Sequence, residues 1–422
     1  MPDRYLIIGN GAAGSTAAGA IRKADPGGNI TIVSDEPGTT YSRPLISYLL
    51  AGKVGPEKML YRDEGFYSGY DINRVVDRVE GIEPAAGRVA LKQGGEVDYD
   101  RLLWATGARA KDLDFKGAEL KGVFTFRTLA DAEGILTLLN GSENAVVLGG
   151  GLVSVMAATA LALRGIKVTM VITSRQLFSQ LLDETSARMA EAALKEGGID
   201  IIFGNDVKQV SAAKGNKARV GRVVFNDGSE LAADIVVAGK GVVPNAEPLA
   251  AAGADSGRGV AVDDHLVTSL ESVWAAGDVA ESWDIPTHSR RLSAIWPNAV
   301  EQGRLAGKNM AGVDAPYRGS AAMNSFKAFE LPFISAGLIK GLGEGHEVME
   351  LSLLEDRVYK KLVFDGDRLV GAIMVGDIDR AGIYTGLIKD ETDVSSFREE
   401  FLRDGFGYIS LPRALRKEKM SI

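Results

Sequence analysis

Short apolar runs recur along the chain, and two of them lead directly into a glycine-rich turn. Residues 5–8 (Tyr-Leu-Ile-Ile) precede residues 9–14 (Gly-Asn-Gly-Ala-Ala-Gly), and residues 145–148 (Ala-Val-Val-Leu) precede residues 149–154 (Gly-Gly-Gly-Leu-Val-Ser). An alanine-rich stretch follows each turn. Short apolar runs bounded by turn residues are typical of buried strands, and the stretches after the turns predict helices. The pattern therefore predicts strand, glycine turn and helix twice.

This arrangement is the one that binds the pyrophosphate of a dinucleotide. The glycines permit a sharp turn and close backbone approach, while the free N–H groups and the helix dipole face the phosphates. One such turn is a weak signal, but two indicate two dinucleotides and electron transfer between them. A second strand, residues 30–33, ends close to Glu36, where a carboxylate would accept hydrogen bonds from a ribose 2′-OH. A solvated acid at a strand end would give the same pattern.

Further strands are predicted from the same pattern. Apolar runs end at residues 105–107 (Ala-Thr-Gly), 239–241 (Gly-Lys-Gly) and 277–278 (Gly-Asp), and residues 167–172 form another run. After about residue 315, the alternating runs 359–364 and 369–374 flank an Asp-Gly-Asp turn, which predicts a hairpin. Residues 397–402 are predicted to be helical. The basic stretch 413–419 is interpreted as a solvated end, with partner docking as the alternative.

Composition limits the possible chemistry. A chain of 422 residues is too long for one ordinary core, and 45% hydrophobic and 25% charged residues are typical of globular proteins. The net charge of -8 argues against nucleic-acid binding. The chain has no cysteine, which excludes a disulfide, a thiolate nucleophile and cysteine-ligated iron–sulfur clusters. Any iron–sulfur centre must therefore belong to a partner.

Localisation is predicted from the absence of the usual signals. The first strand begins within a few residues of the N-terminus, which leaves no room for a cleavable targeting peptide. The most apolar stretch, residues 152–163, is about half a membrane span and is expected to be a buried helix. We therefore expect a cytoplasmic protein. The three histidines, His265, His288 and His346, have no ligand spacing, and no metal site is predicted.

The order of these motifs, with Arg43-Pro44 between the first two, resembles the pyridine nucleotide-disulfide oxidoreductase superfamily. Within it, the chain is most similar to rubredoxin reductases, oxygenase-type ferredoxin reductases and the flavin part of NADH-dependent nitrite reductases. The resemblance extends to about residue 390. It implies an α/β fold with two Rossmann-like dinucleotide-binding domains, as in glutathione reductase, and a C-terminal α+β domain. The expected segments are 1–114 and 243–314 (FAD-binding), 115–242 (NAD(P)-binding) and 315–422 (C-terminal, with the basic tail).

The resemblance also implies which residues meet each cofactor. The first turn would hold the FAD pyrophosphate, the acid after the second strand the adenosine ribose, and the Gly-Asp motif the ribitol. The implied FAD residues are Gly9, Gly11, Ala13, Gly14, Glu36, Arg43, Pro44, Val79, Ala105, Thr106, Gly107, Arg109, Asp278, Trp296 and Asn298. The implied NAD(P) residues are Gly149, Gly151, Leu152, Val153, Thr173, Arg175, Gly239 and Gly241.

The chain departs from the family pattern around the second turn. Ser154 replaces the third glycine, and Tyr48 and Met156 replace a lysine and a glutamate that relatives can pair beside flavin N5. Losing both charges together is physically reasonable, because one buried charge left alone would cost several kcal/mol. We therefore expect Tyr48, Met156 and Trp296 to line a neutral nicotinamide pocket, with hydride transfer at flavin N5 and no certain catalytic side chain. The strand at 167–172 ends without an acid, and Arg175 could meet a 2′-phosphate, so these residues relax discrimination against NADP and leave the nucleotide as NAD(P). Only the resemblance to the family favours NAD.

The leading functional hypothesis is an FAD-dependent NAD(P)H:acceptor oxidoreductase. Its partner would be a rubredoxin, a ferredoxin or an iron–sulfur subunit, because without a cysteine relay the acceptor must come to the flavin. The chain could be a free reductase or the flavin subunit of an aldehyde-oxidising or nitrite-reducing complex. The alternative is a flavin-bearing structural or sensing module whose nucleotide site is degenerate. A simple NADH oxidase is disfavoured because the redox cysteine is absent.

Overall fold

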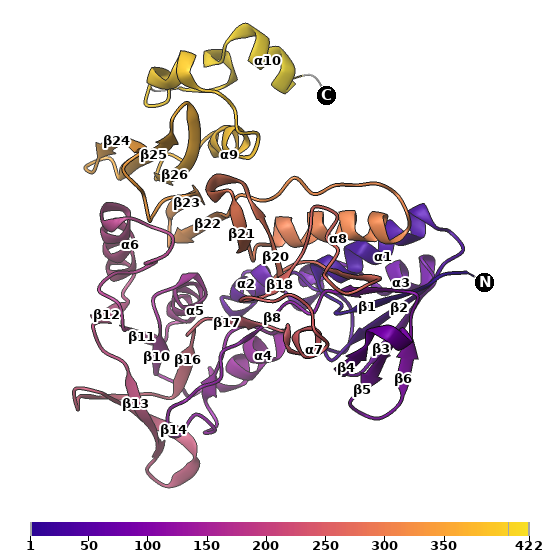
Figure 1. Ribbon diagram of the computed structural model, residues 1–422. Helices are drawn as coiled ribbons and strands as arrows, with labels where there is room; N and C mark the ends of the chain where they lie inside the picture. Colours follow the sequence, from indigo (N-terminus) through magenta and orange to yellow (C-terminus); the bar gives the residue numbers. More distant parts are fainter. Residues whose placement is uncertain (1, 404, 421–422) are drawn as a thin grey trace.

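The computed structural model describes residues 2–403 and 405–420. Its first layer is a five-stranded parallel sheet in the order β19-β7-β1-β2-β3. This sheet contains β1 (Arg4–Ile8), β2 (Asn29–Ser34), β3 (Ile72–Val76), β7 (Arg101–Trp104) and β19 (Val273–Ala275). The strand β19 comes from a segment that follows the second sheet in the sequence, so two separate parts of the chain form the first sheet. Figure 1 labels its strands β1, β2 and β3.

Two helices pack tightly together beside this sheet. These are α1 (Ala12–Ala24), which begins at the first glycine turn, and α8 (Trp296–Met310). A Cβ added to Gly303 would lie 2.2 Å from the Ala13 carbonyl oxygen, and one added to Gly307 would lie 2.6 Å from that of Ala17. Glycines at these positions let the two backbones approach and bring the start of α8 close to the first turn.

A second five-stranded parallel sheet has the order β12-β11-β10-β16-β9. It contains β9 (Val123–Phe124), β10 (Asn144–Leu148), β11 (Lys167–Ile172), β12 (Asp200–Phe203) and β16 (Ile235–Ala238). Three helices accompany it: α4 (Leu129–Leu138), α5 (Leu152–Leu163) and α6 (Glu184–Glu196). The apolar stretch 152–163 is thus the helix after the second turn, as predicted. No helix within residues 2–403 and 405–420 is long and apolar enough to cross a membrane.

The C-terminal region is an antiparallel sheet in the order β22-β23-β26-β25-β24. Its strands are β22 (Met323–Ala328), β23 (Leu331–Gly337), β24 (His346–Leu353), β25 (Val358–Asp365) and β26 (Arg368–Val375), and α9 (Ala381–Lys389) packs against it. The predicted hairpin is the β25–β26 pair. Residues 395–400 form a 3-10 segment rather than an α-helix, because the backbone leaves helical geometry at Phe397, whose ring packs against Phe401. The basic stretch forms α10 (Arg413–Met420).

Smaller elements complete the fold. They are β4 (Val79–Glu83), β5 (Arg88–Leu91), β6 (Glu96–Asp98), β8 (Ala108–Ala110), β13 (Val207–Ala213), β14 (Asn216–Phe225), β15 (Glu230–Ala232), β17 (Val242–Pro244), β18 (Val260–Ala261), β20 (Ala280–Asp284), β21 (Ser289–Leu292), α2 (Ile46–Leu50), α3 (Glu64–Gly69) and α7 (Glu247–Ala251). The α/β class with two Rossmann-like sheets and an added C-terminal domain is confirmed. The segment boundaries given above stay predictions.

Candidate functional site

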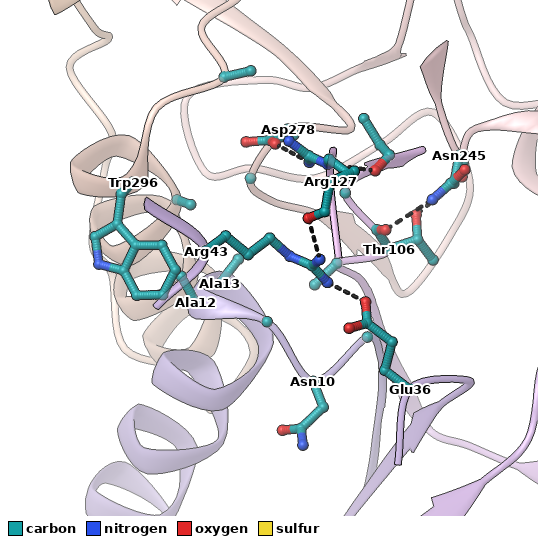
Figure 2. Close-up of a pocket in the computed structure, with 18 of the residues that line it drawn as sticks. Asn10, Ala12, Ala13, Glu36, Arg43, Thr106, Arg127, Asn245, Asp278 and Trp296 are labelled. Atoms are coloured by element: carbon teal, nitrogen blue, oxygen red, sulfur yellow. Dashed lines mark hydrogen bonds and ion pairs between the residues drawn. The ribbon is translucent and has the colours of Figure 1, made fainter. Parts of the chain in front are cut away.

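A cavity of about 640 Å³ is lined by residues of the first turn, helix α5 and strand β22. Figure 2 shows part of its wall around the first turn. Both predicted groups of residues contribute to its wall, although the first group dominates. The predicted residues that line it are Gly9, Gly11, Ala13, Glu36, Arg43, Pro44, Tyr48, Val79, Ala105, Thr106, Gly107, Leu152, Val153, Met156, Asp278 and Trp296. The C-terminal sheet adds Met323, Asn324, Ser325 and Phe326, which no sequence motif had indicated.

The first glycine turn presents an uncapped helix end to this cavity. Gly9 has a φ of +108°, and a Cβ there would lie 2.3 Å from the Ala105 carbonyl oxygen. Gly11 is the N-cap of α1 and has no side-chain cap, and no acidic residue occupies the first turn of the helix. A Cβ on Gly11 would meet nothing within 4 Å. The turn therefore offers free N–H groups and the positive end of a helix dipole to an anionic ligand.

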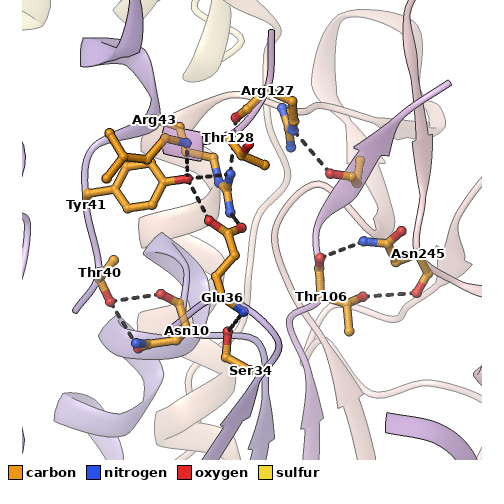
Figure 3. Close-up of polar contacts among 12 residues, drawn as sticks. Asn10, Ser34, Glu36, Thr40, Tyr41, Arg43, Thr106, Arg127, Thr128 and Asn245 are labelled. Atoms are coloured by element: carbon orange, nitrogen blue, oxygen red, sulfur yellow. Dashed lines mark hydrogen bonds and ion pairs between the residues drawn. The ribbon is translucent and has the colours of Figure 1, made fainter. Parts of the chain in front are cut away.

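Glu36 lies at the wall of the cavity in a network of polar contacts (Figure 3). The Tyr41 hydroxyl donates to its Oε2 at 2.7 Å, and the Arg43 guanidinium pairs with its Oε1. Burial alone would lower the pKa of Arg43, but the Glu36 carboxylate outweighs that effect and raises it. Burial raises the pKa of the Tyr41 hydroxyl. Arg43 is therefore a permanent cation, Tyr41 is neutral, and Glu36 is held in a fixed orientation beside the first turn.

Arg127 and Asn245 are two of the site residues that the sequence analysis missed. Arg127 Nη2 pairs with Asp278 Oδ2 at 2.7 Å and Arg127 Nε donates to the Ala108 carbonyl at 3.1 Å. The Arg127 carbonyl accepts from Arg43 at 3.2 Å, so two cations and two acids of the cavity form one connected group (Figure 2). The only signal was local: Thr128 begins a capping box that marks the start of α4, and Arg127 immediately precedes it.

Asn245 is the second missed residue. Its side-chain amide donates to the Thr106 carbonyl at 3.0 Å, and its carbonyl accepts from Thr106 Oγ1 at 3.0 Å and from Trp104 Nε1 at 2.8 Å. Arg109 Nη1 donates to Asn245 Oδ1 at 3.0 Å. Asn245 thus fixes the wall formed by residues 104–107. It follows the strand β17 with no motif around it, which is why the sequence did not reveal it.

The three pocket candidates Tyr48, Met156 and Trp296 all line the same cavity. Trp296 is the first residue of α8, and its ring packs edge-on against Tyr61 with centroids 5.1 Å apart. Tyr48 is 42% exposed and lies at the rim, whereas Met156 is half-buried on α5. The side chains at positions 48 and 156 are uncharged, as the sequence hypothesis requires. Their predicted relation to the nicotinamide stays a prediction.

Three predicted FAD residues do not line the cavity. Gly14 is a packing residue, because a Cβ there would lie 2.0 Å from the Gly9 carbonyl oxygen. The buried Asn298 donates its amide to Ser293 Oγ at 2.7 Å, and Arg109 pairs with Glu247 at 2.7 Å. These three residues contact other parts of the chain and do not face the cavity.

Most predicted nucleotide residues also lie outside the cavity wall. The residues outside the wall are Gly149, Gly151, Thr173, Arg175, Gly239 and Gly241. Of these, Thr173 and Arg175 follow strand β11 and are exposed. Ser154 Oγ donates to the carbonyls of Leu148 at 3.3 Å and Gly239 at 3.2 Å. A Cβ on Gly239 would lie 2.1 Å from that hydroxyl. The serine at the third position is therefore accommodated by a glycine on the neighbouring strand end.

A cluster of acids and a histidine lies outside the cavity. The ligand-type atoms of Asp263, Asp264 and His265 lie within 4.8 Å of one another. Both ring nitrogens of His265 are already hydrogen-bonded, to Asp264 at 2.7 Å and to Asp314 at 2.8 Å. The cluster is therefore an exposed network of hydrogen bonds and gives no reason to assign a metal.

The chain matches known protein families along most of its length. The family described as pyridine nucleotide-disulphide oxidoreductase matches residues 3–303, and the rubredoxin NAD+ reductase C-terminal domain matches residues 323–392. The chain is 32% identical over 425 residues to the NADH-dependent phenylglyoxylate dehydrogenase subunit epsilon of Aromatoleum evansii, covering 99% of this chain and 97% of that one. It is 33% identical over 370 residues to rhodocoxin reductase of Rhodococcus erythropolis, covering 87% of this chain and 84% of that one.

A solved structure supports the same assignment. The ferredoxin reductase for the CYP199A2 system from Rhodopseudomonas palustris is similar with a TM-score of 0.81 and 28% identity, covering 89% of this chain and 91% of that one. Matches of this extent include both sheets and most of the C-terminal region. The chain therefore belongs to the pyridine nucleotide-disulphide oxidoreductase family, whose membership implies FAD and NAD(P)H binding, and it is an oxidoreductase that transfers electrons between NAD(P)H and a redox partner.

Proposed function

We propose that this chain is the FAD-bearing subunit of a larger complex and exchanges electrons between NADH and an iron–sulfur subunit. The observation that carries the proposal is that both glycine-turn helices, α1 and α5, contribute to the wall of one cavity in a chain without cysteine. An internal thiol relay is impossible, so electrons must pass directly between the cavity and a partner. The full-length likeness to a dehydrogenase subunit favours a complex over a free reductase.

The residues around the first turn suit FAD. The uncapped start of α1 at Gly11 would face the pyrophosphate, and Glu36 would accept from the adenosine ribose. Arg43 and Arg127 would offset phosphate charge, and the Asp278 carboxylate would accept from ribitol hydroxyls. The remaining proposed FAD contacts, direct or through packing, are Gly9, Ala13, Gly14, Pro44, Val79, Ala105, Thr106, Gly107, Arg109, Trp296 and Asn298.

The residues around the second turn suit the nicotinamide nucleotide. The N-terminus of α5 would face its pyrophosphate, while the uncharged Tyr48 and Met156 would pack against the nicotinamide. When bound, FAD supplies the ability to take two electrons as hydride and to release them singly. The chain's own residues position the nicotinamide and exclude solvent. The remaining proposed contacts, direct or through packing, are Gly149, Gly151, Leu152, Val153, Thr173, Arg175, Gly239 and Gly241.

We propose NADH as the preferred nucleotide and the cytoplasm as the location. The relative subunit from Aromatoleum evansii is named as NADH-dependent. The residues after β11, Thr173 to Gln176, include no carboxylate that would repel a 2′-phosphate, so we expect NADPH to be accepted more weakly rather than refused.

The proposal is tested on the purified chain under anaerobic conditions. Reduced nucleotide should bleach the flavin absorbance, with a higher kcat/KM for NADH than for NADPH in a one-electron dye assay. Purification from the native source should then yield an iron–sulfur protein in constant ratio to the flavin. A protein that bleaches but purifies alone, and that reduces a small ferredoxin rapidly, would contradict the complex and favour a free reductase of the rhodocoxin reductase kind.

A further inference from the structure

The segment that follows strand β11, residues 173–183, connects the second glycine turn to the C-terminal sheet. The Phe178 N–H donates to the Gly150 carbonyl oxygen at 2.7 Å, which ties the segment to the turn itself. Phe178 has a φ of +49° and its side chain is only 1% exposed. A bulky residue in the left-handed region is held there only when its surroundings enforce that conformation.

The C-terminal sheet supplies the first constraint. The Phe178 ring stacks on Phe326 of β22 with centroids 4.4 Å apart, and Phe326 stacks on Phe333 of β23 at 5.0 Å. Phe326 also lines the cavity. One stack of three rings therefore runs from the second glycine turn, past the cavity wall, into the C-terminal sheet. Such stacks are rigid because each ring fills the space left by the next.

The far end of the segment is held by a second constraint. Asp183 caps helix α6 by accepting from the Ser186 N–H at 3.0 Å, and its Oδ2 accepts from the Tyr359 hydroxyl at 2.6 Å and from Lys361 Nζ at 3.2 Å. The side chains of Asp183 and Lys361 are each 15% exposed. Burial alone would raise the pKa of Asp183, but the hydrogen bonds from Ser186 and Tyr359 outweigh it and lower the pKa. The carboxylate therefore stays ionised and joins α6 to β25.

Helix α6 lies next to the C-terminal sheet (β22–β26), as Figure 1 shows. We propose that β22 and β25 clamp the 173–183 segment, so that the C-terminal sheet completes the NAD(P)H site, with Phe178 and Asp183 as positioning residues. This inference rests on the proposed function, in which the second turn binds the nucleotide. If the segment were loosened, nucleotide binding would have to order it again. The conformational entropy lost in that ordering would weaken the affinity for the nucleotide.

The test measures nucleotide use by variants that loosen each end of the clamp. Tyr359→Phe removes one hydrogen bond to Asp183 and leaves the cap of α6 intact, while Phe178→Leu removes the Phe178 ring from the stack and leaves Phe326 on Phe333. For each, we expect the KM for NADH in a ferricyanide assay to rise about threefold to tenfold, the range of one lost hydrogen bond for Tyr359→Phe and of one lost aromatic pair for Phe178→Leu. We expect kcat and the flavin content per chain to stay within about twofold, because the variants do not touch the first turn.

The matched control is Glu196→Gln. Glu196 is also on α6 and pairs with Arg357 at 2.9 Å, next to β25, but this pair is exposed and lies at the other end of the helix. The control should leave the KM for NADH unchanged. A lower thermal midpoint with an unchanged KM in both Tyr359→Phe and Phe178→Leu would overturn the inference and leave only a structural contact. A wild-type chain that oxidises neither nucleotide would instead overturn the proposed function, and the inference with it.

Discussion

The two glycine turns of this chain have the same topology and different packing. Around the first turn, backbone meets backbone: a Cβ on Gly14 would lie 2.0 Å from the Gly9 carbonyl oxygen. Around the second turn, Ser154 stands at the matching position and donates its hydroxyl to two carbonyls. Gly239 on the neighbouring strand end leaves the space for that hydroxyl. A glycine-rich turn can therefore keep its conformation with a serine at the third glycine position when the neighbouring strand end has a glycine that leaves room for the serine side chain.

The two turns also differ in what supports them. Beside the first, Glu36, Tyr41 and Arg43 form a polar network that lines the cavity. Beside the second, the strand end at Thr173 is exposed, and support comes from the C-terminal sheet through Phe178. The network at the first turn is thus polar and extends to Arg127 beside the second sheet, whereas the segment after the second turn is held by aromatic packing against the C-terminal sheet.

The sharpest test of this comparison replaces matching residues in the two turns. Gly14→Ala forces a methyl group against a backbone carbonyl, and we expect loss of bound flavin and a fall in unfolding free energy of about 1–3 kcal/mol or more. Ser154→Ala removes one hydroxyl, with an expected loss of about 1 kcal/mol. Flavin absorbance per chain and chemical denaturation measure both. Equal effects of the two variants would show that the turns are not packed differently.

The network at the first turn gives the next largest effect. Glu36→Ala removes the partner of Arg43 and the proposed ribose acceptor together, so we expect the Kd for FAD to rise about tenfold to a hundredfold. Recovery of flavin fluorescence on dilution measures that change. The KM for NADH at saturating FAD should stay within about twofold. A variant that retains FAD like the wild type would contradict the ribose assignment.

The strands and helices on either side of both turns were predictable from sequence, whereas many of the side chains that pack around the turns were not. Apolar runs and glycine spacing located β1, β10 and both following helices, because strand, turn and helix are local patterns. Arg127 and Asn245 carry no motif, and they reach the cavity only because distant segments fold together. The role of Phe326 was equally hidden, since an aromatic residue in a strand is ordinarily a core residue. The sequence located the two glycine turns but not Arg127, Asn245 and Phe326, which line the cavity near them.

The preference for NADH over NADPH tests the role of Thr173, the exposed residue that follows strand β11. Thr173→Glu places a carboxylate at the end of β11, where it would accept from a ribose 2′-OH and repel a 2′-phosphate. We expect kcat/KM for NADPH to fall about tenfold and that for NADH to stay within about threefold. Thr173→Gln is the uncharged control and should change neither strongly. Equal losses with both nucleotides would show that position 173 does not face the ribose.

The smallest expected effect concerns pH, because the support of the second turn includes a titrating group. The pKa of Asp183 is lowered in the folded chain, so its stabilisation is fully present above the unfolded pKa of about 3.9 and is lost as pH falls through the lower, folded pKa. We expect Asp183→Asn to be less stable than the wild type by about 1 kcal/mol at pH 7. The gap should narrow below about pH 4. Denaturation at a series of pH values measures it, and a gap that stays constant into acid would mean that the ionised carboxylate does not hold α6 to the C-terminal sheet.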